Sequence, residues 1–246
     1  MDLQLQGKTA IVCGASAGIG LGIAESLAGE GANVVMFARR REVLDREAQR
    51  LGGLAVTGDV TNADDIARLV QTAVDTFGRI DIVVNNSGGP PRSTAAALTP
   101  ELVEAASQLL LGSIVRLTGL CLPYLEKSPA GRIVNVTSST VREPIDNLVL
   151  SNAIRPGVIG WAKSLARELG PKGITVNSIA PGRIDTDRVR EVYPDGPTDA
   201  DLQTIPLRRL GTTREIGDVA AFLCSERAAY VSGAVIFVDG ALTRGL

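Results

Sequence analysis

The sequence predicts a single-domain α/β protein whose core is a Rossmann-type, doubly wound parallel sheet of about seven strands with helices on both faces. Three observations support this class. Short β-branched apolar runs alternate with longer amphipathic stretches along all 246 residues. The runs are almost continuously apolar, as expected for strands that are covered on both faces. A glycine-rich turn follows the first run, and no linker, repeat or low-complexity segment divides residues 1–246.

The individual elements follow from this alternation. Strands are expected at residues 9–14, 33–38, 54–60, 81–87, 132–138, 174–181 and 234–240. Helices are expected near 18–29, 41–51, 62–76, 99–126, 151–169 and 213–224. Thr61-Asn62 precedes one helix, and Thr99 followed by Pro100 gives another a cap and a proline at its first position. The stretch 182–212 is predicted to be irregular, with a substrate loop at about 183–206, because such a long loop is typical of a lid.

Composition narrows the class of function. The net charge is −2 and there is no basic run, so neither nucleic acid nor a membrane surface is expected as a partner. No basic-then-apolar leader is visible, and no apolar run approaches the roughly 18 residues of a membrane span, which predicts a cytoplasmic protein. Cys13, Cys121 and Cys224 form no CxxC pair and are expected to be buried, reduced thiols.

Histidine is absent from the chain. This excludes Ser-His-Asp and Cys-His catalysis as well as imidazole metal ligation. Gly14-Ala-Ser16-Ala-Gly18 matches the G-x-S-x-G pattern of hydrolase nucleophiles, but Ser16 has no histidine base to activate it. The carboxylates are scattered, so no metal site is predicted.

The glycine-rich turn between the first strand and the first helix predicts a nucleotide site. Gly14, Gly18 and Gly20 permit positive φ and close approach of a pyrophosphate, whose charge a helix N-terminus favours. The second strand ends in Ala38-Arg39-Arg40, where an acidic residue would bond a ribose 2′-hydroxyl. Arg39 is suited instead to a 2′-phosphate, which favours NADP(H) over NAD. The alternative is a solvated, charged helix start, which weighs more for Arg40 than for Arg39.

Further motifs follow in order along the chain. They are GDV at 58–60, NNSG at 85–88, VNVTSS at 134–139, SLARELGPKGITVNSIAPG at 164–182 and a closing FVDGA. With the glycine turn, they resemble the short-chain dehydrogenase/reductase family over essentially residues 5–242, and within it the 3-oxoacyl-carrier-protein reductases. The resemblance implies a seven-stranded Rossmann-type sheet, a nicotinamide cofactor and a homo-oligomer, either a dimer or a tetramer packed through two long helices.

The resemblance also implies which residues bind the cofactor. Asp59 and Val60 would flank the adenine, and Pro181 with Gly182 would lie beside the nicotinamide. The full set expected at the cofactor is Gly14, Ser16, Gly18, Ile19, Gly20, Arg39, Arg40, Asp59, Val60, Asn86, Ser87, Gly88, Arg155, Pro181, Gly182 and Ile184.

The family's chemistry uses Asn, Ser, Tyr and Lys, and this chain departs from that pattern at three positions. Ser138 matches the serine that holds the substrate carbonyl. Where Tyr and, four residues later, Lys are expected, the chain has Ser151 and Arg155; where Asn is expected it reads Leu109-Leu110-Leu111. A serine hydroxyl is a far weaker acid than a phenol, whose pKa is about 10. Arg155 keeps the positive charge and can bond the nicotinamide ribose, but a pKa above ~12 is expected to stop it relaying protons.

Each catalytic candidate also has a structural interpretation. Ser151 with Asn152 could cap a helix by accepting a backbone N–H, and Pro156 predicts a distorted first turn. Arg155 could be a solvated charge, and Ser138 a strand-end turn residue. These alternatives stay open at the level of sequence.

Tyr193, on the predicted loop, is the one tyrosine suited to replace the missing acid. The hypothesis is that closure of the loop brings Tyr193 or a water near Ser138. Arginines of the same region could grip a substrate carboxylate or phosphate, although a mixed, solvated surface is favoured. These arginines are Arg142, Arg183, Arg188 and Arg190.

Two functions remain open. The first is an NADP(H)-dependent oxidoreductase acting on a small carbonyl or alcohol, including 3-oxoacyl thioester-like substrates, with an atypical catalytic site. The second is an NADP(H)-binding family member without turnover, acting as a sensor or oligomeric scaffold. Ser138 and the cation at Arg155 favour the first, whereas Ser151 and Leu110 favour the second.

Overall fold

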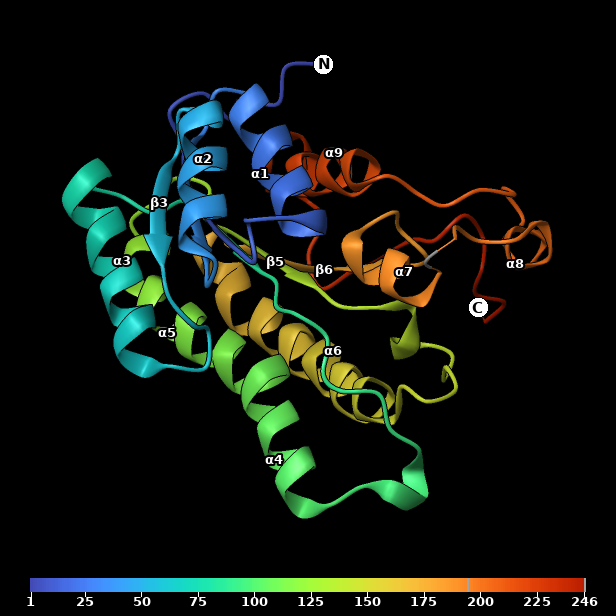
Figure 1. The fold of residues 1–246 in the computed structure, drawn as a ribbon. Coiled ribbons are helices and arrows are strands. Elements are labelled where there is room, and N and C mark those ends of the chain that lie inside the picture. Colours follow the sequence, from blue (N-terminus) through green and yellow to red (C-terminus); the bar gives the residue numbers. More distant parts are fainter. Residues whose placement is uncertain (194, 246) are drawn as a thin grey trace.

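A seven-stranded parallel sheet forms the centre of the computed structural model, which describes residues 1–193 and 195–245 (Figure 1). Its strand order is β3-β2-β1-β4-β5-β6-β7. The strands are β1 (Thr9–Cys13), β2 (Asn33–Ala38), β3 (Leu54–Thr57), β4 (Ile82–Asn85), β5 (Arg132–Val136), β6 (Thr175–Pro181) and β7 (Val235–Val238). The order reverses between β1 and β4, which is where a doubly wound sheet opens a crevice for a ligand. The predicted fold class is confirmed.

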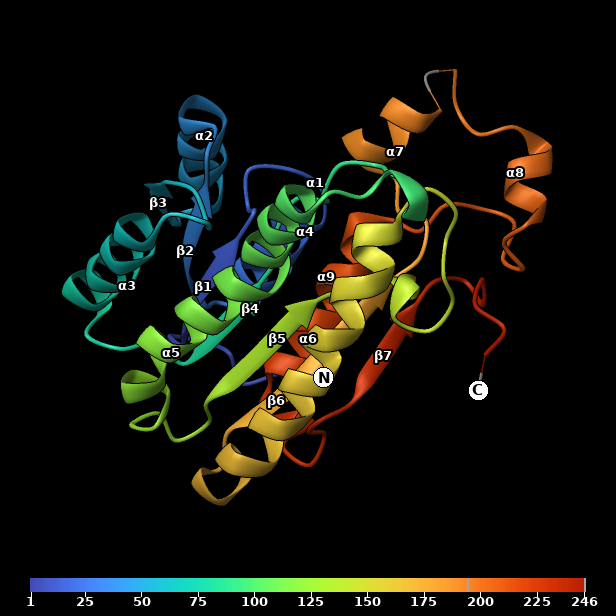
Figure 2. The ribbon, with the colours of Figure 1, turned by 90° about the horizontal axis from the view of Figure 1, so that it is seen from below.

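Helices cover both faces of the sheet, as Figures 1 and 2 show from two sides. One face carries α1 (Gly18–Gly29), α2 (Arg41–Leu51) and α9 (Thr213–Cys224). The other carries α3 (Ala63–Phe77), α5 (Ser113–Leu125) and α6 (Val149–Leu169). The remaining α-helices among the described residues are α4 (Pro100–Ser107), α7 (Asp187–Val192) and α8 (Asp199–Gln203).

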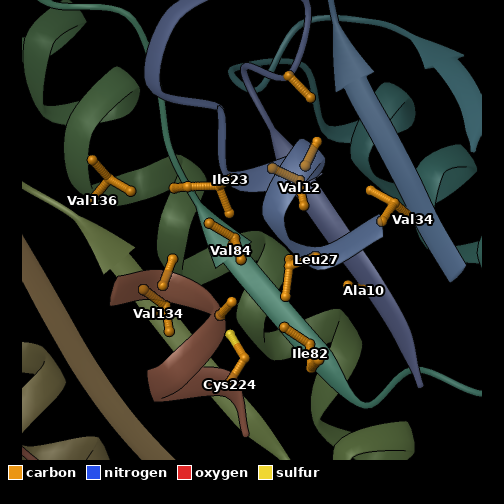
Figure 3. Close-up of a cluster of buried hydrophobic side chains, with 14 of the residues drawn as sticks. Ala10, Val12, Ile23, Leu27, Val34, Ile82, Val84, Val134, Val136 and Cys224 are labelled. Atoms are coloured by element: carbon orange, nitrogen blue, oxygen red, sulfur yellow. The ribbon is translucent and has the colours of Figure 1, made fainter. Parts of the chain in front are cut away.

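Strand β1 shows why the apolar runs form buried strands. Successive side chains point to opposite faces, so Ala10 and Val12 join the core under α1 while Ile11 and Cys13 join the core under α3 and α5. Figure 3 shows the first of these cores, with Ile23 of α1 packed toward the strands. The three cysteines are buried and unpaired, as predicted.

Two predicted helix starts are confirmed by their capping bonds. The Asn62 side chain accepts hydrogen bonds from the backbone N–H groups of Asp64 and Asp65. The Thr99 hydroxyl accepts one from Leu102, and Pro100 is the first residue of α4. Each cap satisfies amides that have no partner inside the helix.

The helix predicted at 99–126 is not a regular α-helix. A π-helical turn, Gln108–Gly112, separates α4 from α5, and the Ser113 hydroxyl bonds the Leu109 carbonyl at 2.6 Å. The extra residue of the π-turn shifts the helical register. The span Pro100–Leu125 is also long and apolar enough, by length and composition, to cross a membrane. A stretch of 18 of its residues has a mean hydropathy of 1.5, and 39% of that stretch is buried. The expectation that no run approaches such a length is therefore wrong.

Helix α6 begins two residues earlier than predicted, which overturns the capping role of Ser151. Leu148 occupies the N-cap position without a side-chain cap, and Ser151 lies within the first turn. Asn152 instead exchanges two hydrogen bonds with the backbone of Ile145. Pro156 lies inside the helix beyond its first turn, and the helix continues to Leu169. The distortion expected from this proline stays a prediction.

The segment between β6 and α9 is more ordered than predicted. It contains α7 and α8, and Thr198 with Asp201 forms a reciprocal capping box at the start of α8. Its two ends are joined because Asp185 donates to the Gly211 carbonyl and Gly211 donates to the Arg183 carbonyl. Figure 2 shows both short helices beyond the ends of β6 and β7.

Candidate cofactor and active site

The glycine turn after β1 is packed so closely that side chains are excluded. Gly14 and Gly18 have φ values of +64° and +56°, which glycine adopts without strain. A Cβ atom on Gly20 would lie 2.2 Å from the Gly14 carbonyl oxygen. The Asn86 amide donates to the Cys13 carbonyl at 3.2 Å and would meet a Cβ on Gly14 at 2.6 Å. The turn is therefore shaped by protein contacts alone.

The N-terminus of α1 offers free amides above this turn. Its N-cap residue, Ala17, makes no side-chain cap bond, so the first N–H groups remain available to an anion such as a pyrophosphate. Ser16 lies beside them and is nearly buried. The residues present thus fit the phosphates of a dinucleotide.

Thr186 is a neighbour of this turn that sequence analysis missed. Its methyl carbon would lie 3.3 Å from a Cβ on Gly18, and its hydroxyl donates to the Ile184 carbonyl. Ile184 itself is buried. The sequence offered only a weak signal for this role, because a threonine immediately before a helix that starts at Asp187 is typical of an ordinary N-cap.

At the other end of the crevice, Arg39 faces Asp59. The side chain of Arg39 is 78% exposed, and its Nη1 lies 3.9 Å from Oδ2 of Asp59. The pKa of Asp59 is lowered chiefly by the Thr61 backbone N–H, which donates to Oδ1, and its hydroxyl donates there as well. Arg40 is exposed at the N-cap of α2. Arg39 is therefore a loosely held cation beside a fixed carboxylate.

Several residues predicted to bind the cofactor lie together near the carboxyl ends of strands β1 and β4. Val60 and Asn86 line the same small cavity of about 10 Å³ between the sheet and α5. Ser87 follows Asn86, and its hydroxyl donates to the Gly88 carbonyl.

At the end of β6, Pro181 is buried and pairs with Val238 of β7. The Gly182 N–H donates to the Val238 carbonyl, and a Cβ on Gly182 would lie 2.6 Å from Cβ of Asp239. The backbone is therefore fixed at the position predicted to lie beside the nicotinamide.

Ser138 lies just beyond the carboxyl end of β5. Its hydroxyl oxygen accepts the Thr140 N–H at 3.2 Å and caps the short turn Ser139–Val141. The turn interpretation is thus correct, and the bond leaves the hydroxyl proton free to donate. Ser151, from the first turn of α6, is 6% exposed, and its hydroxyl has no hydrogen bond to the described residues.

Arg155 lies one helical turn after Ser151 and is held against the same strand. Its Nη1 donates to the Val136 carbonyl at 3.2 Å, while Nε is enclosed and meets no acceptor among the described residues. Loss of hydration lowers the pKa of the guanidinium to about 10. The interpretation of Arg155 as a solvated charge is wrong, and so is the expectation that its pKa stays above ~12.

The arginines of the loop are engaged in surface contacts. Arg190 pairs with Asp185 and Asp187, and Arg183 donates to the Asp201 carbonyl. These contacts match the mixed, solvated surface that sequence analysis favoured.

Tyr193 is directed at a loop carboxylate. Its hydroxyl, together with the stronger bonds from Thr198, lowers the pKa of Asp201. In this conformation the phenol faces Asp201, and its proposed movement toward Ser138 stays a prediction.

The loop after β5 binds the end of the described chain. Glu143 accepts the N–H groups of Arg244 and Gly245. Arg142 donates to the Gly245 carbonyl and stacks 4.2 Å from the ring centroid of Phe237. Arg142 and Glu143 therefore hold the tail in place, and they form no anion grip in this arrangement.

Comparison with known proteins identifies the family. A family model described as Enoyl-(Acyl carrier protein) reductase matches residues 14–243. The chain is 38% identical over 244 residues to the 3-oxoacyl-[acyl-carrier-protein] reductase FabG of Vibrio cholerae, covering 98% of this chain and 99% of that protein. It belongs to the short-chain dehydrogenase/reductase family.

Two solved structures of short-chain reductases share this fold closely. The L-sorbose reductase of Gluconobacter frateurii, in complex with NADPH and L-sorbose, superposes with a TM-score of 0.93 at 32% identity over the full length of both chains. An NADPH-bound short chain oxidoreductase of Pseudomonas aeruginosa, described as containing an atypical catalytic center, gives 0.92 at 33% identity over 97% of this chain and 98% of that chain.

Proposed function

We propose that this protein is an NADP(H)-dependent reductase of small carbonyl compounds, with Ser151 and Arg155 in the positions of the family's Tyr and Lys. The main support for the proposal is the glycine turn. Gly20 packs directly against Gly14, and the first backbone N–H groups of α1 remain able to bind a pyrophosphate. The similarity to NADPH-bound reductases supports the cofactor. The similarity to a 3-oxoacyl-carrier-protein reductase supports a carbonyl substrate, including 3-oxoacyl thioesters.

The preference for NADP(H) rests on Arg39, with Arg40 beside it. Among the described residues, Arg39 is held by a single 3.9 Å pair with Asp59, so its guanidinium can turn to a 2′-phosphate at little cost. A charge-assisted pair of this kind contributes about 1.5–3 kcal/mol.

The protein's own residues define the reaction geometry. Pro181 and Gly182 would hold the nicotinamide ring of the cofactor, which would supply the hydride when bound. The Ser138 hydroxyl, fixed by the Thr140 N–H, donates to the substrate carbonyl and orients it. Arg155 keeps a positive charge at the carboxyl end of β5, where negative charge develops on the carbonyl oxygen.

Cofactor choice is tested by titration with NADPH and NADH. Trp161 of α6 is the only tryptophan, so energy transfer from its fluorescence reports binding directly. Arg39→Ala should raise the Kd for NADPH by roughly tenfold or more while leaving NADH binding unchanged. Arg41→Ala, which removes an exposed arginine at the start of α2, two residues after Arg39, is the matched control. Equal weakening of both cofactors in Arg39→Ala would contradict the role of Arg39.

The second candidate function is NADP(H) binding without turnover. It is favoured by Ser151, whose aliphatic hydroxyl lies where the family has a phenol and makes no hydrogen bond within the described part of the chain. Oxidation of bound NADPH by a broad panel of ketones, aldehydes and 3-oxoacyl thioesters separates the two. Tight binding with no oxidation on any of them supports a sensor or scaffold. In the same assay, unchanged turnover in Tyr193→Phe would eliminate Tyr193 as proton donor.

Assembly into a homo-oligomer is part of the same proposal. Val115 and Leu120 of α5 leave 43% and 40% of their surface exposed, which suits burial against another copy of the long helix. Light scattering should show a dimer or tetramer, and Leu120→Glu should shift it toward the monomer.

A further inference from the structure

Arg155 differs from Arg132, a second enclosed arginine, in having no carboxylate partner among the described residues. Arg132 is 2% exposed and lies 3.7 Å from Glu226. The half-exposed Arg79 also has a carboxylate partner, Asp81, at 2.6 Å. Among the described residues, Arg155 bonds only the Val136 carbonyl. Its Nε has no acceptor and no solvent, so the protein stabilises its protonated form poorly.

The three tyrosines, the residue type that donates the proton in the family, are poorly placed to serve the carboxyl end of β5. Tyr230 is fully exposed. Tyr124 lies under the Lys127 ammonium at 6.0 Å, and Tyr193 faces Asp201. Histidine is absent. Of the side chains predicted to form the catalytic site, this leaves two serine hydroxyls and one guanidinium.

Building on the proposed reductase function, we propose that Arg155 is the proton donor of the reaction. As the hydride reaches the carbonyl carbon, an N–H bond of the guanidinium breaks. Its proton forms the O–H bond on the carbonyl oxygen that Ser138 orients. The product is the alcohol, and the neutral guanidine regains its proton from solvent water.

The surroundings of Arg155 suit this role. Burial brings its pKa to about 10, the ordinary value of the phenol whose place Ser151 takes, and proton transfer to an alkoxide is then strongly downhill. Nη2 makes no hydrogen bond to the described residues, and unlike Nε it is not enclosed. Ser151, four residues earlier on the same face, contributes a side chain much smaller than a tyrosine and so leaves room for a substrate oxygen.

The first test needs no substrate or cofactor. The Arg155 guanidinium is followed by nitrogen NMR in the free protein as the pH is raised, and its signal is assigned by its loss in Arg155→Lys. We expect deprotonation near pH 10, well before an exposed arginine titrates. The proposal would be overturned if the Arg155 guanidinium stayed protonated up to the pH at which the other arginines lose their protons.

The second test separates proton donation from charge. Arg155→Ala should lower the rate of carbonyl reduction by about 10²–10⁴-fold, whereas Arg167→Ala, at an exposed position of the same helix, should not. Added guanidines and primary amines of graded pKa should then restore the rate, with the logarithm of the rescued rate varying with pKa. Rescue that is equal for every cation would assign Arg155 a purely electrostatic role.

The outcomes distinguish this inference from the function on which it rests. A wild-type protein that binds NADPH but reduces no carbonyl compound overturns both. Full turnover in Arg155→Ala overturns only the role of Arg155. Arg155→Lys, which keeps a cation with a titratable proton, controls for folding and should retain measurable activity with an altered pH profile.

Discussion

The two edges of the sheet treat buried charge in opposite ways. At the amino edge, Asp81 is fully buried and accepts hydrogen bonds from Arg79, Ser128 and the backbone N–H of Thr9. At the carboxyl edge, the Arg155 guanidinium bonds one carbonyl, and its Nε finds no acceptor in residues 1–193 and 195–245. Partnerless hydroxyls occur at both edges, on Thr9 and Thr140, so the contrast concerns charge.

The difference separates stability from function. A buried charge that is fully hydrogen-bonded stabilises the folded structure. Removing it leaves its hydrogen-bonding partners without their counterpart, which lowers the unfolding free energy. A buried charge with spare donors contributes little to folding and stays available to a ligand or a reaction. We therefore expect substitutions at the two edges to have opposite effects on stability.

The largest effect is expected for Asp81→Asn at the amino edge. Loss of the carboxylate charge weakens the bonds that the buried side chain accepts from Thr9, Ser128 and Arg79. Because the half-exposed Arg79 is rehydrated by solvent, the cost should be about 2 kcal/mol of unfolding free energy. Urea unfolding measures this, with the exposed Asp45→Asn as control. Activity per folded molecule should not change, because Asp81 is remote from the glycine turn. A cost no greater than that of Asp45→Asn would remove the basis of the comparison.

The same carboxylate predicts a pH dependence of stability. Burial alone raises the pKa of Asp81, but the bonds from Arg79, Ser128 and Thr9 outweigh it and hold the pKa below its usual value. Its contribution is therefore complete above the unfolded pKa of about 3.9 and is lost as the pH falls through the lower, folded value. Wild-type stability should fall more steeply than that of Asp81→Asn in this acid range. If the two proteins lost stability in parallel as the pH fell, the lowered pKa of Asp81 would be contradicted.

At the carboxyl edge, Arg155→Met should stabilise the protein. Removing a poorly paired, enclosed cation in favour of an apolar side chain of similar length should raise the unfolding free energy by about 1 kcal/mol. Carbonyl reduction should be lost at the same time. Arg132→Met is the matched substitution at the amino edge, and it should destabilise because Arg132 bonds the Ser225 and Gly131 carbonyls. If both substitutions changed the unfolding free energy in the same direction, the contrast between the two edges would be refuted.

The smallest effects come from two serines. Ser128 donates to Asp81 at 2.5 Å, so Ser128→Ala should cost about 1 kcal/mol. Ser151 is more deeply buried, but its hydroxyl has no hydrogen-bond partner among the described residues, so Ser151→Ala should lie within about 0.5 kcal/mol of the wild type. Paired denaturant curves decide this, and a larger loss for Ser151→Ala would reveal a bond absent from this structure.

Much of the fold was predictable because its signals are local. The apolar runs and the caps at Asn62 and Thr99 mark elements that tertiary contacts leave unchanged. The π-turn at Gln108–Gly112 was not predictable, since one extra residue leaves the apolar pattern almost intact. The start of α6 at Val149 was missed because its cap is Leu148, which carries no polar signal.

The site was predictable as a set of positions but not as a set of environments. The glycine turn follows from residue type, because only glycine fits those contacts. The lowered pKa of Arg155 depends on the strand and helix that enclose it, and no pattern within α6 encodes that enclosure. Thr186 meets Gly18 only after the chain returns from β6, so its proximity is likewise a tertiary property.

The turn at Gly14 and Gly20 has a kinetic consequence. Gly20 packs so closely on the Gly14 carbonyl that the turn has little room to move, so capture of a dinucleotide need not wait for a loop to order itself. Association should be a single step whose speed scales with concentration, with no slow rearrangement trailing behind it.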